Sequence, residues 1–359
     1  MKVAILGAGA IAHSAAAFLA PAGHEPVIWS PSGRSAAALA EGRPLVARVA
    51  IEGEFTVAAA SSCAAALEGA DAILVALPAY GHRAVLDAAV PHLRSNQAVL
   101  FSSHASFGAL YLSKRLAERG ADAPLIAVWG TTITTGRMGG PALVNVATVR
   151  SKVDVATLPA SRAEEGHALC TALFGDRFVL RDGLMAIALS NLNPQNHLGI
   201  ALLNLTRMEK GETWGQGENV TPAVGRFIEA LDAERLRIAE QFGLSVRTVR
   251  EHFSLSFHVP MSTVSEMNQE MHRQGRGGFG PTTIESRYIL EDVPFGLWPT
   301  VLVGRMAGAP AVLHEAGVSI FSASYGRDLT ADNDILPALG FEAMSLGDLR
   351  RLTRDGYGQ

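Results

Sequence analysis

Cysteine is nearly absent from this chain. Only Cys63 and Cys170 occur among 359 residues, far apart and without any paired spacing. Neither a disulfide framework nor a zinc site is therefore indicated, and we predict no metal. The low cysteine usage fits a reducing compartment, so we expect a cytoplasmic protein.

The chain also lacks a strong excess of one charge, and aromatic residues are few. The formal net charge is -4, charged residues make up 18% of the chain, and aromatic residues make up 6%. A surface for nucleic acid needs a basic stripe that releases counterions from the phosphate backbone. Acids and bases alternate here without such a stripe, so we predict no nucleic-acid partner.

Long uninterrupted apolar runs are missing as well. No stretch long enough to span a bilayer lacks charged or strongly polar residues. The start of the chain imitates a secretory signal only superficially, because Gly7, Gly9 and His13 interrupt its apolar run. We expect a soluble protein with no membrane partner.

Short apolar runs alternate with helical patterns in the first half of the chain. The alternation predicts an α/β fold with a doubly wound parallel sheet, as in a Rossmann domain. The expected strands lie at 2–6, 25–29, 72–77, 98–101 and 125–128, and the expected helices lie at 11–20, 81–93 and 108–119.

The first expected strand leads into a glycine fingerprint. Residues 7–12 read G-A-G-A-I-A, which fits the G-x-G-x-x-A pattern between a strand and a helix. Gly7 permits the tight turn, and Gly9 lets the backbone approach a pyrophosphate. The amides of the helix that begins near Ala10 and Ile11 can then bind the negatively charged pyrophosphate at the positive end of the helix dipole. We therefore predict that this segment binds a nicotinamide dinucleotide.

The second expected strand ends without the acid that NAD-selective sites place there. Ser30, Ser32 and Arg34 follow instead, and their hydroxyls and guanidinium suit the additional phosphate of NADP. Arg34 could also be an ordinary exposed loop residue, so the missing acid carries more weight. We expect NADP(H) to be preferred, with NAD(H) possible.

Two further strand ends supply candidate site residues. Leu77 and Pro78 close the strand expected at 72–77, where doubly wound sheets bind ligands, and they either line the nicotinamide ribose or only terminate the strand. His104 follows the strand expected at 98–101 and is a second candidate acid or base. A polar loop histidine at a strand end is more often solvent-exposed and inert.

Long helical patterns dominate after about residue 183. They lie at 184–209, 222–241, 246–253 and 298–316. We predict a dinucleotide-binding domain over 1–182 and a mostly α-helical substrate and catalytic domain over 183–359, in line with the chain length. The glycine-rich segment 274–281 is expected to be a mobile loop, and the apolar helical half favours a homodimer.

Several polar residues interrupt the helix expected at 184–209. Asn193, His197 and Asn204 are spaced by four and seven residues, which places them on one helical face. A lone histidine on an apolar face is more often a satisfied core residue than a catalyst. Spacing alone leaves both interpretations open.

These residues belong to a pattern that resembles the octopine and nopaline dehydrogenase (opine dehydrogenase) family over almost the whole chain. Its marks are the fingerprint at 7–12, N-P-Q-N-H at 193–197 followed by Asn204, and R-Y-I-L-E-D-V-P at 287–294 leading to Gly296 and Leu297. Leu198 stands where the family usually has proline, and S-S-H-A-S at 102–106 stands where it tends toward Pro-Gly.

The resemblance implies a reaction and three residue roles. His197 would donate and accept the proton, Asp292 would hydrogen-bond its imidazole, and Arg287 would hold a substrate carboxylate. Asn193, on the expected face of His197, completes the candidate catalytic set. The implied reaction condenses the amine of an amino acid with a 2-oxo acid and reduces the imine with hydride from NADPH, the substrates lying between the domains.

Other interpretations stay open without the resemblance. Asp292 could cap a helix, and Arg287 could form a surface ion pair with Glu285 or Glu291. A 2-oxo acid or ketone reductase of the ketopantoate-reductase or hydroxyacid type would share the two-domain layout and need no amine. A regulator that senses NADP without chemistry is a third possibility, against which the set of catalytic residue types argues.

Overall fold

The computed structural model describes residues 1–120 and 123–358, which form two compact units. The first unit comprises Met1–Ala188 together with the C-terminal segment from Gly347, and the second comprises Leu189–Leu346. The C-terminal helix α17 (Leu346–Asp355) thus belongs almost entirely to the first unit. The domain division expected after residue 182 stays a prediction.

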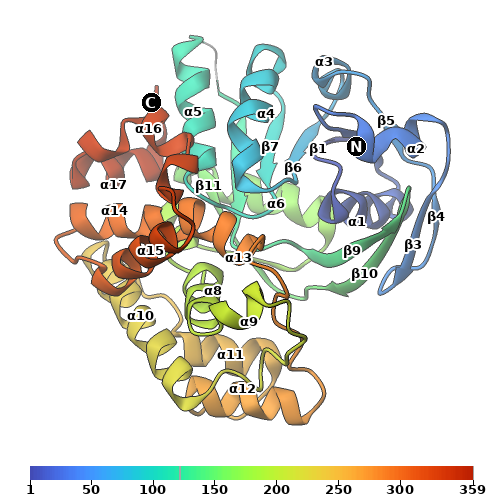
Figure 1. Cartoon of the computed structure of the whole chain (residues 1–359). Helices are drawn as coiled ribbons and strands as arrows, with labels where there is room; N and C mark the ends of the chain where they lie inside the picture. Colours follow the sequence, from blue (N-terminus) through green and yellow to red (C-terminus); the bar gives the residue numbers. More distant parts are fainter. Residues whose placement is uncertain (121–122, 359) are drawn as a thin grey trace. The chain divides into compact units, whose positions relative to one another are not determined.

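An eight-stranded sheet forms the centre of the first unit, with the strand order β12-β11-β8-β7-β6-β1-β2-β5 (Figure 1). Neighbouring strands are parallel except β11, which runs antiparallel to β8. The strands are β1 (Lys2–Leu6), β2 (Glu25–Trp29), β5 (Ala58–Ala59), β6 (Ala72–Val75), β7 (Ala98–Phe101), β8 (Leu125–Trp129), β11 (Val153–Leu158) and β12 (Phe178–Leu180). The predicted Rossmann-like parallel sheet is therefore confirmed.

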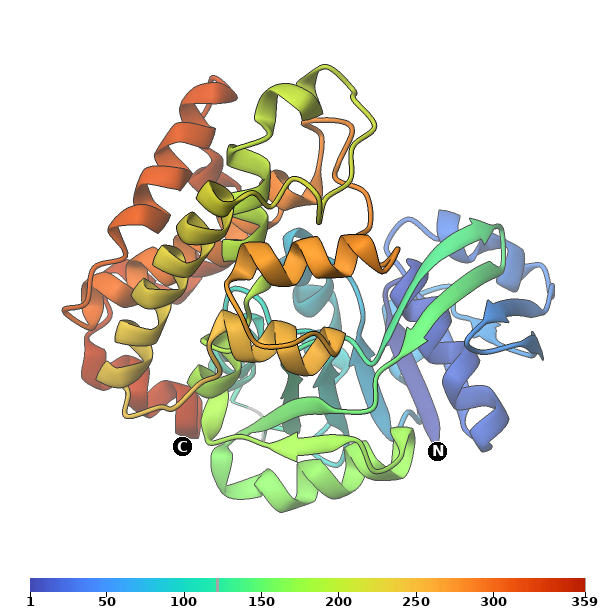
Figure 2. The ribbon, with the colours of Figure 1, turned by 90° about the horizontal axis from the view of Figure 1, so that it is seen from below.

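Helices cover both faces of this sheet, which is why its central strands are continuously apolar. Figures 1 and 2 show α1 and α6 on one face and α3, α4 and α5 on the other. Val3 to Leu6 of β1 are consequently inaccessible to solvent. The helices of the unit are α1 (Ala10–Leu19), α2 (Ala37–Ala40), α3 (Cys63–Leu67), α4 (His82–Ala89), α5 (Gly108–Glu118), α6 (Ala163–Phe174) and α7 (Gly183–Ala188).

A second sheet of four strands, which the sequence did not predict, packs beside α1 (Figure 2). Its order is β4-β3-β10-β9, with β3 (Leu45–Val49), β4 (Gly53–Phe55), β9 (Thr134–Gly140) and β10 (Leu143–Val149). Gly136 of β9 allows the close approach, because a Cβ there would lie 3.1 Å from Ser14 Oγ of α1. The helix that follows the glycine fingerprint is therefore covered, and its His13 and Ser14 are fully buried.

The second unit is helical, as predicted. It contains α8 (Asn193–Leu202), α9 (Leu205–Glu209), α10 (Pro222–Gln241), α11 (Val249–Phe257), α12 (Val264–Arg273), α13 (Arg287–Leu290), a π-helical turn (Val293–Leu297), α14 (Trp298–Met306), α15 (Val312–Ser324) and α16 (Ile335–Leu339). Capping boxes begin α11 and α12, where Thr248 pairs with Glu251 and Thr263 with Glu266. No helix in the described part of the chain is both long and apolar enough to cross a membrane.

Two long helices predicted for this region are wrong. The pattern at 184–209 forms three helices, α7, α8 and α9, because Pro194 lies in the first turn of α8 and a proline cannot continue a preceding helix. The pattern at 298–316 is divided between α14 and α15, because Gly308 adopts a left-handed conformation with φ of 67° and Pro310 follows.

Candidate active site

The glycine fingerprint adopts the strand-to-helix turn expected of it. Gly7 has a φ of +131°, and a Cβ at this position would lie 2.2 Å from the carbonyl oxygen of Ala76. Its amide donates a hydrogen bond of 2.8 Å to the carbonyl oxygen of Trp29. Because β1, β2 and the end of β6 converge here, only glycine fits at residue 7.

Gly9 meets a different environment from Gly7. It is the N-cap of α1, and a Cβ built on it would have no atom within 4 Å. No side chain caps the first turn of α1, and no acidic residue lies in that turn. The amides that begin with Ala10 and Ile11 therefore offer a positive helix end in open space, which fits the pyrophosphate of a dinucleotide.

The loop after β2 carries hydroxyls and one cation. Ser30 is half-buried, and its Oγ atom has no hydrogen-bond partner among the described residues, whereas Ser32 and Arg34 are exposed. No described acidic side chain pairs with Arg34. These three side chains could hold a ribose phosphate.

Leu77 lies against the glycine turn. Its Cβ would be 3.4 Å from a Cβ at Gly7, while Pro78 is exposed and begins the turn toward α4. The structure therefore places the end of β6 next to the fingerprint of β1, two neighbouring strands of one sheet.

The expectation that His104 is exposed to solvent is wrong. Its side chain is 3% exposed and packs edge-on against Phe107. Burial, with a contribution from the charge of His82, lowers the pKa of His104 to about 3. His82 is equally buried, its Nε2 atom lies 3.1 Å from the carbonyl oxygen of Leu77, and burial lowers its pKa to about 4. Both imidazoles are neutral at neutral pH and inaccessible to a substrate as they stand.

His197 and Asp292 meet in the second unit. The Nδ1 atom of His197 on α8 lies 2.6 Å from Oδ2 of Asp292, and the two side chains are 15% and 11% exposed. Asp292 occupies the N-cap position of the π-helical turn, but its side chain forms no cap hydrogen bond and bonds His197 instead. The Nε2 atom of His197 bonds no described protein atom and is the nitrogen available to a substrate.

Tyr288 covers one face of the same imidazole, which the sequence did not predict. The two ring centroids lie 3.5 Å apart, and the ring planes differ by 10°. The hydroxyl of Tyr288 donates a hydrogen bond of 2.8 Å to Oε1 of Gln216. The only sequence signal was the position of Tyr288 inside the segment R-Y-I-L-E-D-V-P.

Arg287 is mostly exposed at the start of α13. Its side chain is 66% exposed, and its Nε atom lies 3.6 Å from Oε2 of Glu291. Glu291 is 17% exposed, and a contact this long from a solvent-exposed guanidinium contributes little to stability. The guanidinium is therefore available to a carboxylate ligand.

Asn193 and Asn204 do not share a face as predicted. Asn193 is the exposed first residue of α8, one turn before His197. Asn204 lies beyond the end of α8, is buried, and donates a hydrogen bond of 3.0 Å to the carbonyl oxygen of Ile200. The break between α8 and α9 separates the two residues and leaves the amide of Asn204 engaged locally.

A buried polar network holds α8 from another side. Gln195 donates a hydrogen bond of 2.8 Å to Asp232 of α10, and Arg235 pairs with the same carboxylate at 2.7 Å. The amide of Val249 donates to its second oxygen at 2.8 Å. Every oxygen of this buried carboxylate thus has a partner, which is the condition for its burial.

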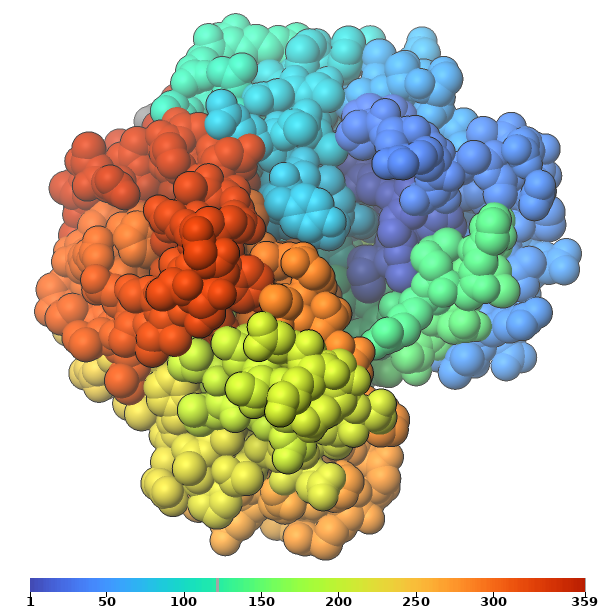
Figure 3. Space-filling view, viewed as in Figure 1, coloured from blue at the N-terminus to red at the C-terminus, as the bar shows by residue number. Residues whose placement is uncertain are grey.

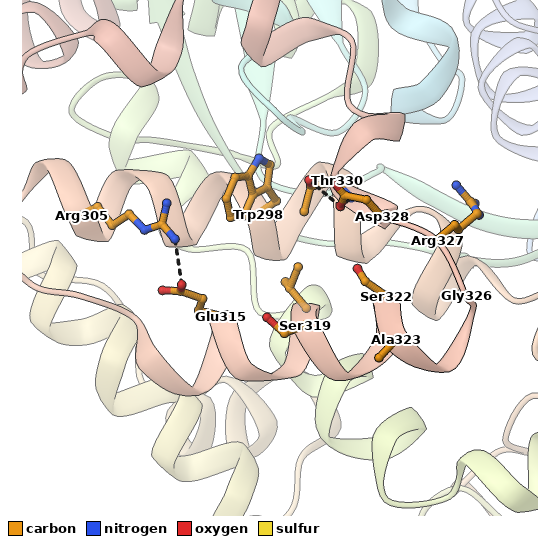
Figure 4. Close-up of a pocket in the computed structure, with 11 residues that line it drawn as sticks. Trp298, Arg305, Glu315, Ser319, Ser322, Ala323, Gly326, Arg327, Asp328 and Thr330 are labelled. Atoms are coloured by element: carbon orange, nitrogen blue, oxygen red, sulfur yellow. Dashed lines mark hydrogen bonds and ion pairs between the residues drawn. The ribbon is translucent and has the colours of Figure 1, made fainter.

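The described residues offer no metal site, and a cavity of the second unit lies apart from His197. Among the described residues, no group of three or more His, Cys, Asp or Glu side chains could hold a metal ion. A cavity of about 540 Å³ is lined by α14, α15 and the turn that follows (Figure 4), and none of its lining residues is His197, Tyr288 or Asp292. Its Arg305 is engaged by Glu315 at 2.8 Å and by the ring of Trp298.

Known proteins resemble this chain in both halves. The family model of the NAD/NADP octopine/nopaline dehydrogenase α-helical domain matches residues 180–325, and the model of the ketopantoate reductase PanE/ApbA matches residues 3–105. An opine dehydrogenase of Arthrobacter sp. (strain 1C) is 30% identical over 358 residues, which cover 97% of each chain.

Two solved structures share the fold. The octopine dehydrogenase complex with NADH and agmatine aligns with a TM-score of 0.80 and 14% identity over 99% of this chain and 98% of the other. Yersinopine dehydrogenase with bound NADP+ aligns with a TM-score of 0.73 and 16% identity over 95% and 97%. At these identities the likeness concerns the fold alone.

Proposed function

This chain belongs to the opine dehydrogenase family, and from that premise we propose that it uses NADPH to join the amine of an amino acid to a 2-oxo acid. It is an NAD(P)-dependent oxidoreductase of the type that acts on CH–NH bonds. The observation that carries the proposal is the hydrogen bond between His197 and Asp292, which leaves Nε2 of His197 available.

The proposed reaction has two stages. The amine adds to the keto carbon and water leaves, which forms an imine, and the imine then takes up one hydride and one proton to become a secondary amine. The nicotinamide cofactor, when bound, supplies the hydride. The protein supplies positioning and the proton.

His197 and Asp292 handle the proton in this proposal. The carboxylate accepts a hydrogen bond from Nδ1, fixes the tautomer of the ring and stabilises its charged form. Nε2 then donates a proton to the carbonyl oxygen that leaves as water, and it is the acceptor in the reverse reaction. Asn193, one turn earlier on α8 and exposed, is the fourth residue of the proposed site.

Arg287 holds the carboxylate of the 2-oxo acid in this proposal. A guanidinium binds a carboxylate through two parallel hydrogen bonds, which fixes both position and orientation. Its present contact is long, with 3.6 Å between Nε of Arg287 and Oε2 of Glu291. Exchange of that partner for the substrate carboxylate therefore costs little.

The preference for NADP over NAD is supported by the loop after β2. Gly7, Gly9, Ala10 and Ile11 would hold the pyrophosphate, with Leu77 and Pro78 beside the turn. Ser30, Ser32 and Arg34 would hold the additional ribose phosphate, since no acid is placed there to repel it. NAD is the weaker alternative.

The proposal also includes a homodimer in the cytoplasm, with the amino acid and the 2-oxo acid as its small-molecule partners. The apolar helical unit supports the proposal of a homodimer, and the low cysteine usage supports the cytoplasmic location. Sedimentation equilibrium of the purified chain tests the first, and a monomer at micromolar concentration contradicts it.

A matrix of substrates tests the function. Amino acids are combined with pyruvate, 2-oxoglutarate and similar acids, and the loss of NADPH is followed by absorbance, with His197→Ala as the control. We expect turnover only when amine and oxo acid are both present. Turnover at full rate with the oxo acid alone contradicts the proposal.

A carbonyl reductase that needs no amine is the second candidate, because the ketopantoate reductase model matches residues 3–105. Turnover at full rate with the oxo acid alone is its signature. Tight NADPH binding without turnover in any combination, unaffected by His197→Ala, would instead indicate a sensing regulator.

A further inference from the structure

Two contacts of different kinds hold the imidazole of His197, one at a ring nitrogen and one at the ring face. Asp292 bonds Nδ1 in the plane of the ring at 2.6 Å, and Tyr288 stacks on its face with centroids 3.5 Å apart. A single in-plane hydrogen bond leaves the ring free to tilt, whereas a face contact fixes the plane. With both contacts in place, Nε2 points in one direction.

Tyr288 is itself held from the far side of the ring. Its hydroxyl donates to Oε1 of Gln216 at 2.8 Å, and its amide donates to Oγ of Ser286 at 3.3 Å. The ring cannot swing away from the imidazole without losing its hydrogen bond to Gln216, while the amide bond to Ser286 fixes the backbone of Tyr288 at the start of α13. The stack is therefore a built contact rather than a chance overlap.

Gln216 lies on a segment that is tied to the glycine-rich residues 274–281. The amides of Gln216 and Gly217 donate to the carbonyl oxygens of Gly278 and Gly277 at 3.0 and 3.1 Å. In Figure 3 the yellow-green surface of the chain that follows α8 borders the orange surface of the chain that follows α12. The segment expected to be a mobile loop thus braces Gln216.

A second pair of bonds closes this brace. The amide of Gly280 donates to the carbonyl oxygen of Trp214 at 3.0 Å, and the indole of Trp214 donates to the carbonyl oxygen of Pro281 at 2.9 Å. A Cβ at Gly280 would lie 2.1 Å from the indole ring, so glycine is required. The chain of contacts runs from this brace through Gln216 and Tyr288 to His197.

We propose that Tyr288, braced by Gln216, is a positioning residue that fixes the plane of the His197 imidazole for proton transfer. The inference rests on the proposed function of His197. Tyr288 acts through the imidazole and not by binding substrate, so it should affect the rate of the chemical step and not substrate affinity. Correct orientation of a catalytic group contributes strongly to rate, and a small misplacement costs about 10- to 100-fold.

The test compares four variants in the NADPH-dependent condensation. Tyr288→Leu removes the ring, and we expect kcat to fall about 10- to 100-fold with the KM of both substrates within about twofold. Tyr288→Phe keeps the stack and should restore kcat to within about threefold of the wild type. Gln216→Leu removes the same hydrogen bond as Tyr288→Phe. The variant that combines these two substitutions should therefore lose no more kcat than either substitution alone.

Tyr325→Phe is the matched control. Its hydroxyl bonds the carbonyl oxygen of Ile284 in the same unit and does not contact His197. It should alter the free energy of unfolding and leave kcat unchanged. A kcat of Tyr288→Leu within threefold of the wild type, or a failure of Tyr288→Phe to restore the rate, overturns the proposal.

Failure of the proposed function can be told apart from failure of this inference. If the wild type does not condense any amine with an oxo acid, the proposed function fails. NMR can then still test whether the Tyr288 ring lies over the imidazole of His197. The Cε1 proton of His197 lies under the Tyr288 ring current, so Tyr288→Leu should move its resonance downfield while Tyr288→Phe leaves it in place. An unchanged resonance in Tyr288→Leu overturns the inference.

Discussion

The Nδ1 atom of His197 lies 2.6 Å from Oδ2 of Asp292, although the two residues are 95 positions apart in the chain. The bond joins the helix α8 to the residue that immediately precedes the π-helical turn. It defines one tautomer of the imidazole and leaves Nε2 for the substrate. The arrangement suggests which substitutions should affect chemistry and which should affect binding.

Asp292→Asn should lower kcat about 10²- to 10⁴-fold, because the amide keeps the shape of the side chain but no longer stabilises the charged imidazole. The dissociation constant of NADPH should stay within about twofold. Steady-state kinetics and fluorescence titration measure the two effects. Asp328→Asn is the control, since that carboxylate bonds within its own turn to Thr330. An unchanged kcat in Asp292→Asn contradicts the proposed pair.

Arg287→Leu should raise the KM of the 2-oxo acid about 10- to 100-fold, because a charge-assisted bidentate contact is lost. The KM of the amino acid should change much less. Glu291→Gln is the comparison, because it frees Arg287 from its 3.6 Å contact and should leave the KM of the oxo acid the same or lower. Equal changes in both KM values for Arg287→Leu would show that the residue does not select the oxo-acid carboxylate.

Arg34→Ala should raise the dissociation constant of NADPH about 10-fold and leave that of NADH unchanged, because only NADP carries the additional phosphate. Arg43→Ala is a suitable control, since Arg43 lies nearby in sequence and pairs with Glu41 at 3.0 Å. Isothermal titration calorimetry with both cofactors gives the comparison. A parallel loss for NADH and NADPH would contradict a phosphate contact.

Gly7→Ala and Gly9→Ala should separate stability from binding. At Gly7 the added Cβ would lie 2.2 Å from Ala76 O at a φ of +131°, so the free energy of unfolding should fall by roughly 2–4 kcal/mol. At Gly9 the Cβ meets no protein atom, so stability should stay within about 0.5 kcal/mol. NADPH binding should nevertheless weaken at least about 10-fold, since the Cβ takes the place of the pyrophosphate. Urea unfolding measures the free energy of unfolding, and titration measures the dissociation constant of NADPH. Undiminished NADPH binding by Gly9→Ala would contradict a pyrophosphate site at Gly9.

Stability should fall between neutral pH and pH 5 because of His82 and His104. Burial lowers the pKa of His82 to about 4 and, with the charge of His82, that of His104 to about 3, against 6.5 for both in the unfolded chain. The unfolded state therefore binds more protons below pH 6.5, and each histidine should remove about 2 kcal/mol of stability at pH 5 relative to pH 7.5.

Urea unfolding of His104→Gln at both pH values checks this pH dependence. The loss of stability on acidification should be smaller by about 2 kcal/mol than in the wild type. His92→Gln, at an exposed histidine, should leave the loss as it is. An identical loss in His104→Gln and the wild type would contradict buried neutral imidazoles.

Local patterns predicted those elements that are defined by their own residues. The strands β1, β2 and β7 and the helix α10 have the predicted bounds, because apolar runs and helical periodicity are properties of neighbouring residues. The turn at Gly7 was predictable for the same reason, since only glycine suits a positive φ at a strand-to-helix junction. His197, Asp292 and Arg287 were selected through their resemblance to a family and not through their spacing.

Contacts between distant segments were decided by the tertiary structure alone. The sheet that covers α1 pairs β3 with β10, residues about one hundred positions apart, and no local pattern indicates such a partner. The break of the helix expected at 184–209 followed from Pro194, whose signal was present in the sequence but was outweighed by apolar periodicity. His104 reads as a polar loop residue, yet packing buries it.

The sequence by itself determined the parallel sheet, the dinucleotide turn and the residue types available for proton transfer, because each depends on short-range patterns or on a motif. Only the tertiary structure showed that Asp292 bonds His197, that Tyr288 stacks on it, and that Gln216 holds Tyr288. These contacts join α8, α13 and the segment before α10, whose relative positions depend on the packing of a whole helical unit.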